Sequence, residues 1–387
     1  MHTVVSGDTL FNIAKRYGVT VANLRNWNKL SSDALKIGQK LIVKAPTPAP
    51  TPTPTPPPPK PAPTPTPPPP APNPTPNTGN FLTVRQGFVL QTTPDNGFNR
   101  HVLRVPLNGG QVLMASMRDN LNMSRFMVYP NGISWAGQSR LELDLATIQS
   151  VGLTPQQAKA LQYVSTHEGA FDAINSFDKA IFSYGFIQFA GAVAVGSSLS
   201  RLMANMKANA PQVFQQIFMR AGIDVDNGTI VALDNNGRLQ RGDEALLLIQ
   251  RDLRLCGPFI QAGFEPALVR EQLRTANQLY IQPALNFKLD VNIGGIRVII
   301  PKISDVLQSE GALTAVFAIG INQGIGGMSK IVASSVGNVA LQSGLRSAAE
   351  LSRMDERAVI QNIADTAADT RVRDRALGVL REGMSFV

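Results

Sequence analysis

The chain has 387 residues, of which 43% are hydrophobic and 16% are charged, so it can build folded cores and is not disordered throughout. At roughly 100–200 residues per domain, this length allows two or three domains. The formal net charge is +9, and the first 45 residues hold seven Lys or Arg against two Asp. A chain that binds nucleic acid through its large part would be more basic there, so we expect no nucleic-acid partner.

The metal-ligating residue types are few. The single cysteine, Cys256, excludes an internal disulfide framework and any zinc site built on several thiolates. We expect Cys256 to be a buried small apolar residue. His2, His101 and His167 are scattered along the chain, so no metal site and no cofactor is predicted.

Membrane and export signals are absent from the sequence pattern. No apolar stretch reaches the roughly 20 residues that a membrane helix needs, so no membrane span is predicted. The N-terminus shows no basic region followed by an apolar segment, so no secretion signal is visible. We expect export by another route, or a leader that this sequence does not include.

Residues 1–45 predict a miniature β-α-α-β unit. A short strand at 3–5 and a turn at 6–8 precede Thr9, which can cap a helix that ends at Gly18. Thr20 caps a second helix, and a closing strand follows Gly38. The apolar residues at helical spacing are Leu10, Ile13, Ala14 and Tyr17 in the first helix, and Val21, Leu24 and Trp27 in the second.

The segments SGDTL, IAKRYGV, N-x-L and GQKL follow one another in this unit, and with them it resembles a LysM module from end to end. The resemblance implies binding of N-acetylglucosamine polymers such as peptidoglycan or chitin. The groove would lie between the loop after the first strand and the loop after the second helix, at Gly7, Asp8, Thr9, Leu10, Asn28 and Leu30. On residue chemistry alone, Asp8 and Thr9 can instead cap the helix and Leu10 can belong to the core.

Residues 46–79 are expected to be a linker. Nineteen of the 28 prolines lie between Pro46 and Pro76, alternating with threonine or with one another. Such a sequence favours polyproline II, a semi-rigid spacer. It separates the N-terminal unit from a larger folded part.

Residues 80–387 predict an α+β, mainly helical part with a β-rich start. Within residues 80–140, short apolar alternations at 81–93, 101–107, 111–117 and 125–137 are broken by Asn-Gly turns. From about residue 143 the pattern is helical, so we divide this part into 80–140 and 141–387. The predicted helices begin at Pro155 and Pro266, follow Asp243, and cover 304–321 and 328–381, with one hairpin at 229–240.

The helix from Pro155 carries a carboxylate on its apolar face. Ala158, Leu161 and Ser165 lie on one stripe, and Glu168 continues it in the last turn before Gly169. Burial and the negative end of the helix dipole both favour the neutral carboxyl, so the pKa at such a place rises. A general acid needs this environment.

The order of this glutamate, a loop with Asp172, Asn175 and Asp178, and an aromatic-Gly-x-x-Gln at 184–188 resembles the lysozyme-like superfamily. That group includes lytic transglycosylases, phage lysozymes and chitosanases. The resemblance implies Glu168 as the acid, Asp178 as a second carboxylate, and Tyr184 and Gln188 in the wall of the cleft.

A later stretch, TAVFAIGINQGIGG, resembles the A-Y-N-A-G motif of lytic transglycosylases. Asn322 matches its asparagine and Gly324 its glycine. Ile321 stands where the motif has tyrosine, which leaves the subfamily open.

Each of these residues also has a purely structural interpretation. Glu168 can be an ordinary helix-end acid paired with an arginine, and Asp178 an exposed turn aspartate. Tyr184, with Phe186 and Phe189, can form one side of a buried strand. Asn322 can cap a loop between two helices.

Together these features predict a peptidoglycan-degrading glycosidase that acts at the cell wall, outside the cell or in the periplasm, and cleaves β-1,4 bonds with Glu168 as general acid. Asp178 can activate a water and give inversion, or the sugar's own 6-hydroxyl can react and give an anhydro product. Two alternatives remain. One is a non-catalytic wall-binding or assembly part of a phage or injection machine; the other is a chitinase- or chitosanase-type enzyme.

Overall fold

The computed structural model describes residues 1–5, 8–17, 24, 27–28, 30, 35–36, 38–43, 80–119, 126–139, 145–192 and 197–386. It describes the side chains of all these residues except those at positions 11, 12, 15, 145, 165–168 and 322. The expected linker at 46–79 therefore lies outside the described residues. The chain divides into two units, Met1–Ala71 and Pro72–Val387, which are described separately.

The first unit has the predicted order of elements. Strand β1 (His2–Thr3) pairs antiparallel with β2 (Lys40–Leu41), and helix α1 (Leu10–Tyr17) lies between them in the sequence. Leu24, Trp27 and Asn28 are helical, where the second helix was expected. The core consists of Val4, Leu10, Ile13, Ala14, Leu24, Leu41 and Val43. Both strands are shorter than predicted, because only two residues of each form the ladder.

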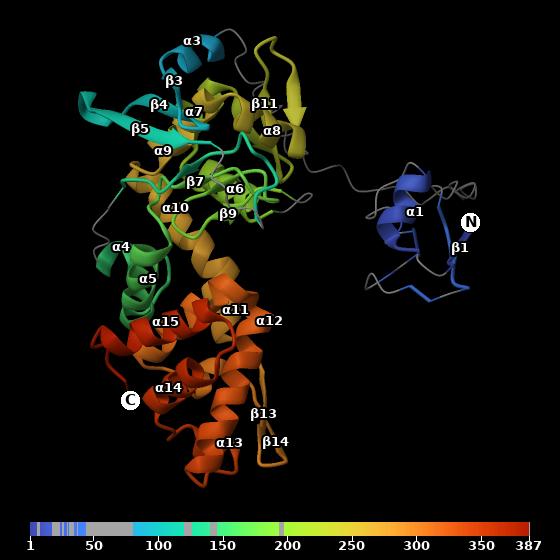
Figure 1. The fold of residues 1–387 in the computed structure, drawn as a ribbon, viewed down its shortest axis with the longest axis vertical. Helices are drawn as coiled ribbons and strands as arrows, with labels where there is room; N and C mark the ends of the chain where they lie inside the picture. The colour runs from blue at the N-terminus through green and yellow to red at the C-terminus, as the bar shows by residue number, and fades with distance from the viewer. Residues whose placement is uncertain are drawn as a thin grey trace, which may run out of the picture. The chain divides into compact units, whose positions relative to one another are not determined.

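The second unit contains a seven-stranded antiparallel sheet in sequential order (Figure 1). Its strands are β3 (Val89–Asp95), β4 (Phe98–Pro106), β5 (Val112–Arg118), β6 (Ser134–Trp135), β7 (Ile174–Asn175), β8 (Ser183–Tyr184) and β9 (Phe189–Ala190). Strands on both sides of residue 140 thus share one sheet. The strands predicted at 101–107 and 111–117 are confirmed. Of the described part of the region 125–137, only the two residues of β6 form a strand.

The prediction of a strand from residue 81 was wrong at its start, because Phe81–Gln86 form helix α3. Phe81 and Arg85, one helical turn apart, are both buried. The Arg85 guanidinium donates to the carbonyl oxygens of Ala221 and Leu233, at 2.8 and 2.5 Å. These long-range bonds fix α3 on the body of the unit, and a local strand pattern cannot reveal them.

A second, three-stranded sheet contains the predicted hairpin. Strand β11 (Thr229–Leu233) pairs with β12 (Leu239–Arg241) and with β10 (Ile223–Asp226), a strand that the sequence analysis did not identify. The helices of this region are α6 (Ser198–Asn209), α7 (Pro211–Ile217), α8 (Asp243–Arg251), α9 (Cys256–Ala262) and α10 (Pro266–Ala276). The helix predicted after Asp243 is divided in two, because it ends at Arg251 and resumes at Cys256.

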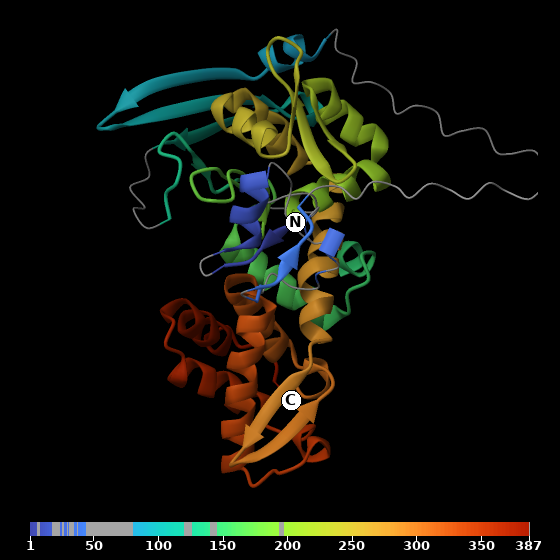
Figure 2. The same ribbon diagram turned by 90° about the vertical axis from the view of Figure 1, so that its right-hand side faces the viewer.

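The remaining elements lie at the other end of the unit from β3–β5 (Figures 1 and 2). A π-helical turn (Asn277–Ile281) and α11 (Gln282–Leu285) extend α10, and a hairpin of β13 (Leu289–Ile293) and β14 (Ile296–Ile300) follows. Helix α12 (Glu310–Gln342) is broken at Gly324, where φ is 69° and ψ is 164°. Helices α13 (Ala348–Leu351), α14 (Glu356–Thr366) and α15 (Thr370–Arg381) complete the mainly helical part.

Cys256 is fully buried, as predicted, and this burial raises the pKa of its thiol. In the part of the chain that the structure describes, no helix has the length and apolar character needed to cross a membrane. The described residues also contain no group of three or more His, Cys, Asp or Glu arranged for a metal ion.

Candidate functional site

Helix α5 (Pro155–Glu168) begins and ends as predicted. Thr154 caps it through a reciprocal pair of hydrogen bonds with Gln157, and Pro155 occupies the first turn. Ala158 and Leu161 are buried, which confirms the apolar stripe. Glu168 is the last helical residue. Its side chain lies outside the described part, so its role as general acid stays a prediction.

The chain directly after α5 is anchored by Asp172, which has no exposed surface. Its Oδ2 accepts from the indole Nε1 of Trp135 at 2.9 Å, and its Oδ1 accepts from the backbone N–H groups of Gln138 and Ser139 at 2.9 and 2.8 Å. Burial raises the pKa of this carboxyl, although the three hydrogen bonds oppose the rise. A Cβ at position 263 would overlap Asp172, so glycine there allows α9 to approach.

Gln272 of α10 holds the other side of the same region. Its Nε2 donates to the carbonyl oxygen of Phe171 at 2.8 Å and to the Tyr184 hydroxyl at 3.1 Å. Its Oε1 accepts from the backbone N–H of Phe186 at 3.4 Å. A Cβ on Gly185 would overlap this same Oε1. One buried amide therefore links the segment after α5, strand β8 and the β8–β9 turn.

The small β7–β8–β9 part of the sheet carries unusual backbone conformations. Four described non-glycine residues have positive φ, and two of them, Asn96 and Asn227, precede glycine in hairpin turns that suit asparagine. The other two are Ile181 (φ 62°) and Gln188 (φ 55°). A branched residue such as isoleucine adopts this region only under strain. Strained residues cluster at functional sites, so this segment is the best candidate site in the unit.

The side chain of Gln188 adds a second signal. Its Nε2 donates to the carbonyl oxygen of Gly185 at 2.9 Å. Its Oε1 is buried and has no hydrogen-bond partner, the only such side-chain atom found among the described residues. A buried acceptor without a partner is unfavourable unless a donor arrives from outside. Gln188 as a whole is half-buried, unlike Tyr184, so a rotation of its amide would bring this oxygen to the surface, where a sugar hydroxyl or acetamido N–H would supply the donor.

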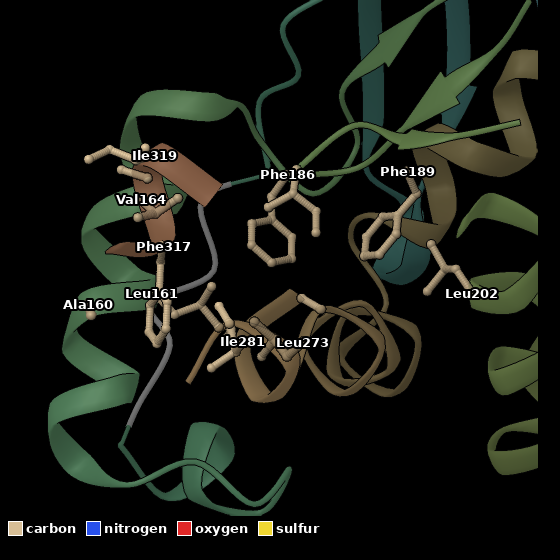
Figure 3. Packing of buried hydrophobic residues seen from close by; sticks show 14 of the residues in the cluster. Ala160, Leu161, Val164, Phe186, Phe189, Leu202, Leu273, Ile281, Phe317 and Ile319 are labelled. Carbon is tan, nitrogen blue, oxygen red and sulfur yellow. The ribbon is translucent and has the colours of Figure 1, made fainter. Parts of the chain in front are cut away.

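The aromatic residues in and next to the aromatic-Gly-x-x-Gln motif at 184–188 lie in the core. Tyr184 has no exposed surface, contacts Phe259 edge-on at 5.2 Å between ring centroids, and has a pKa raised by burial. A glycan cannot reach Tyr184. The expectation that Tyr184 lies in the wall of the cleft was therefore wrong, and the residue belongs to the core. Phe186 and Phe189 point toward α10 and the π-helical turn, near Leu273 and Ile281 (Figure 3).

Asp178 lies in the turn before β8 and is half-buried. Its Oδ1 accepts from the backbone N–H of Ala180 at 2.9 Å, and its carbonyl oxygen accepts from Ile181 at 3.0 Å. The carboxylate thus stabilises the turn that contains the strained Ile181. These bonds agree with the structural interpretation of Asp178 as a turn aspartate. They use only one of its two carboxylate oxygens within this turn.

The stretch that resembles the A-Y-N-A-G motif lies in α12, and α12 packs beside α5. Leu161 and Val164 of α5 face Phe317 and Ile319 of α12 (Figure 3). The side chain of Asn322 lies outside the described part, and Gly324 is the residue that breaks the helix. A narrow apolar pocket of about 10 Å³, room for about one water, separates α5, Ile187 and α12, so it is not a sugar subsite.

In the N-terminal unit, the expected groove residues hold the loops in place. Asp8 accepts from the Val5 backbone N–H at 2.9 Å and pairs with His2 Nε2 at 2.7 Å. The bond from Val5, followed by the one from His2, lowers the pKa of Asp8. Asn28 exchanges hydrogen bonds with the backbone of Ile42 at 2.6 and 2.9 Å.

The other expected groove residues divide into three kinds. Leu10 is buried in the core, which supports its structural interpretation, and Leu30 is half-buried against the same core. Thr9 is exposed. Gly7 lies outside the described residues.

The sequence analysis mentioned Asp172 without a role and missed Trp135 and Gln272. A signal for Gln272 exists, because it is a polar residue on the same helical stripe as the apolar Leu268, Val269 and Ala276 of α10. No comparable local signal identifies Trp135, whose partner is 37 residues away.

Comparison with known proteins identifies the first unit. Residues 2–44 match the LysM domain family, so the chain has a LysM domain at its N-terminus. An autolysin of Enterococcus faecalis is 65% identical over 43 residues, which are 11% of this chain and 6% of the autolysin. A probable endopeptidase p60 of Listeria innocua is 48% identical over 46 residues, 12% of this chain and 10% of that protein.

A probable N-acetylmuramidase of Lactococcus lactis subsp. cremoris is 50% identical over 42 residues, 11% of this chain and 10% of that protein. The chain therefore spans a tenth or less of the length of these relatives. No solved structure matches the chain.

Proposed function

We propose that this protein is a peptidoglycan-degrading glycosidase, a muramidase or lytic transglycosylase, that acts at the cell wall. Its LysM domain would bind the wall, and relatives with this domain are named as an autolysin and an N-acetylmuramidase. In the proposed organisation, residues 1–45 bind glycan and 46–79 are the linker. Residues 80–140 are the β-rich segment, and 141–387 hold the lysozyme-like catalytic part.

One observation supports the catalytic half most strongly. The strained residues Ile181 and Gln188, with the unpartnered oxygen of Gln188, lie in the two connections between β7, β8 and β9, the strands that follow α5 in the chain. A fold that maintains both features without a ligand gains no stability from them. A ligand that donates a hydrogen bond to Gln188 would satisfy its unpartnered oxygen.

In the proposed mechanism, Glu168 is protonated and donates its proton to the glycosidic oxygen as positive charge develops on the sugar. The hydrogen bonds of Asp172 and Gln272 hold the chain after α5 and the β8–β9 turn, and in this proposal they would position Glu168 and Gln188 relative to each other. Asn322 would contact the glycan from the α12 side.

The second step has two forms. Asp178 can activate a water on the opposite face of the sugar, which inverts the anomeric carbon. Alternatively, the 6-hydroxyl of the muramic acid attacks, Glu168 accepts its proton, and an anhydro product leaves. The groove of the LysM domain, including Gly7, Asp8, Thr9 and Asn28, would hold an adjoining part of the same polymer.

The test is mass spectrometry of the products released from purified peptidoglycan and, in parallel, from chitin and chitosan. Reducing muropeptides indicate a muramidase, and anhydro-muropeptides indicate a lytic transglycosylase. If products appear only from chitin or chitosan, that polymer, and not peptidoglycan, is the substrate. Release of nothing from any polymer would contradict the proposal and favour the non-catalytic wall-binding or assembly part.

A further inference from the structure

Three arginines lie on one exposed face of the β3–β4–β5 sheet. Alternation along the strands places the side chains of Leu103, Val105 and Ala115 inward, where they are fully buried. The opposite face carries Arg100 and Arg104 of β4 and Arg118 of β5, all exposed. We call this opposite face the arginine face.

The strand register brings two of these charges together. Arg100 and Arg118 are directly opposite each other in the β4–β5 ladder. Like charges in this position repel and destabilise a sheet. Both guanidinium groups lie over the ring of Phe98, at 6.0 and 5.1 Å from its centroid. The ring holds the two positive charges side by side on the surface.

Little negative charge on this face balances the arginines. Asp95, at the hairpin end, accepts from Arg100 at 2.7 and 3.1 Å. Arg104 and Arg118 form no ion pair within the described part of the chain. Arg104 lies four residues along β4 from Arg100, or about 13 Å, so positive charge extends along the strand.

The remaining residues of the arginine face suit a sugar polymer. Between the arginines lie uncharged side chains, namely Gln91, Thr93, Val102, Met114 and Ser116, and the exposed Val89 and Val112 continue the face beside Arg104. Met114 is 51% exposed, so no other element of this unit covers the centre of the face. An uncovered sheet face with exposed guanidinium groups fits a glycan that carries carboxylates.

We propose that the arginine face is a second binding surface for peptidoglycan, in which Arg104 and Arg118 contact carboxylates of its peptide side chains. This inference rests on the proposed function for the choice of polymer. It assigns a role to the β-rich segment, and it adds to the glycan groove of the LysM domain. Two weak contacts on one polymer strengthen each other, so the face would raise the residence of the enzyme on the wall.

The test measures binding of the full chain to purified sacculi that have been stripped of phosphate-containing polymers. Every protein carries E168Q, and the supernatant is checked for released muropeptides, so that any remaining cleavage is detected and does not enter the binding result. A saturating neutral N-acetylglucosamine oligomer occupies the LysM groove. We expect R104Q/R118Q to bind about fivefold more weakly than the parent, because each exposed contact is worth a few-fold in affinity.

Three controls identify the cause. R104K/R118K keeps the charge but loses the planar guanidinium that stacks on Phe98, so it should bind more tightly than R104Q/R118Q and more weakly than the parent. R353Q/R381Q removes two exposed arginines elsewhere in the unit and should also bind within about twofold. Sacculi whose carboxylates have been converted to amides should bind the parent as weakly as they bind R104Q/R118Q.

The proposal is overturned if R104Q/R118Q binds stripped sacculi like the parent, or if R353Q/R381Q weakens binding equally. It is also overturned if the arginines matter only for sacculi that retain phosphate polymers, which would then be the ligand. Product analysis tests cleavage separately. If the protein proves to have no glycosidase activity, the binding result can therefore still be interpreted.

Discussion

Trp135 donates its indole N–H to the buried carboxylate of Asp172 at 2.9 Å, and this bond joins β6 to the residues that follow α5. Both residues belong to the core, and two backbone N–H groups complete the set of donors to Asp172. The bond fixes the chain four residues after Glu168. The position of the proposed acid thus depends on a contact with a strand that precedes its own helix.

Removal of the indole donor should weaken the large unit. W135F keeps an aromatic ring but deletes the hydrogen bond to a buried carboxylate, so we expect a loss of about 2 kcal/mol in the free energy of unfolding. Denaturant unfolding followed by circular dichroism measures it. W27F, in the LysM domain, should leave this transition unchanged; an equal effect of both variants would contradict the anchoring role.

The contact between Gly185 and Gln272 predicts a non-additive pair of mutations. G185A should destabilise the unit by about 2 kcal/mol, because alanine is strained at φ 83° and its Cβ would overlap Gln272 Oε1. Q272A removes the overlap, so adding G185A to Q272A should be less harmful than G185A alone. Strict additivity in the four unfolding curves would show that the two residues do not interact.

Some features followed from local sequence, and others did not. Thr154, Pro155 and Gly169 mark the ends of α5, because capping is a local interaction. Helical spacing predicted the LysM core residues Leu10, Ile13 and Ala14, but Tyr17 on the same stripe is 41% exposed and lies outside the core. Helix α3 and the burial of Asp172 could not be predicted from local sequence, because they depend on contacts with Leu233 and Trp135, which are distant in the chain.

In the candidate site, too, some features could be predicted from the sequence and others could not. The sequence indicated the β7–β9 segment through its aromatic-Gly-x-x-Gln motif, and the structure finds its strained residues there. The sequence could not separate Gln188, with its unpartnered oxygen, from Tyr184, which is part of the core. That difference depends on the direction of each side chain in a short strand and a tight turn.

Gln188 should matter more for cleavage than for stability. Q188A loses one hydrogen bond, to Gly185, but also removes a buried acceptor without a partner, so the free energy of unfolding should change by less than about 1 kcal/mol. If its oxygen accepts from the glycan, the rate of muropeptide release should fall more than about tenfold. An unchanged rate in a folded Q188A would remove Gln188 from the site.

The Asp8 carboxylate should make the LysM domain sensitive to acid. Its pKa is lower in the folded state than the ordinary value of 3.8, so its stabilising contribution is complete above that value and is lost as the pH falls through the folded pKa. Hydrogen exchange in residues 1–17 should be slower in the wild type than in D8N at about pH 5, and the difference should shrink steadily as the pH falls below 3.8. A difference that grows with acid would contradict this sign.

The most direct test of the catalytic account is the rate at which E168Q releases muropeptides from purified sacculi. Loss of a general acid typically lowers a rate by about 10²–10⁴-fold, so release by E168Q should fall at least a hundredfold while sacculus binding and the unfolding transition stay unchanged. E382Q, which alters an exposed glutamate at the end of α15, should cleave like the wild type. Wild-type release by E168Q would contradict the assignment of Glu168.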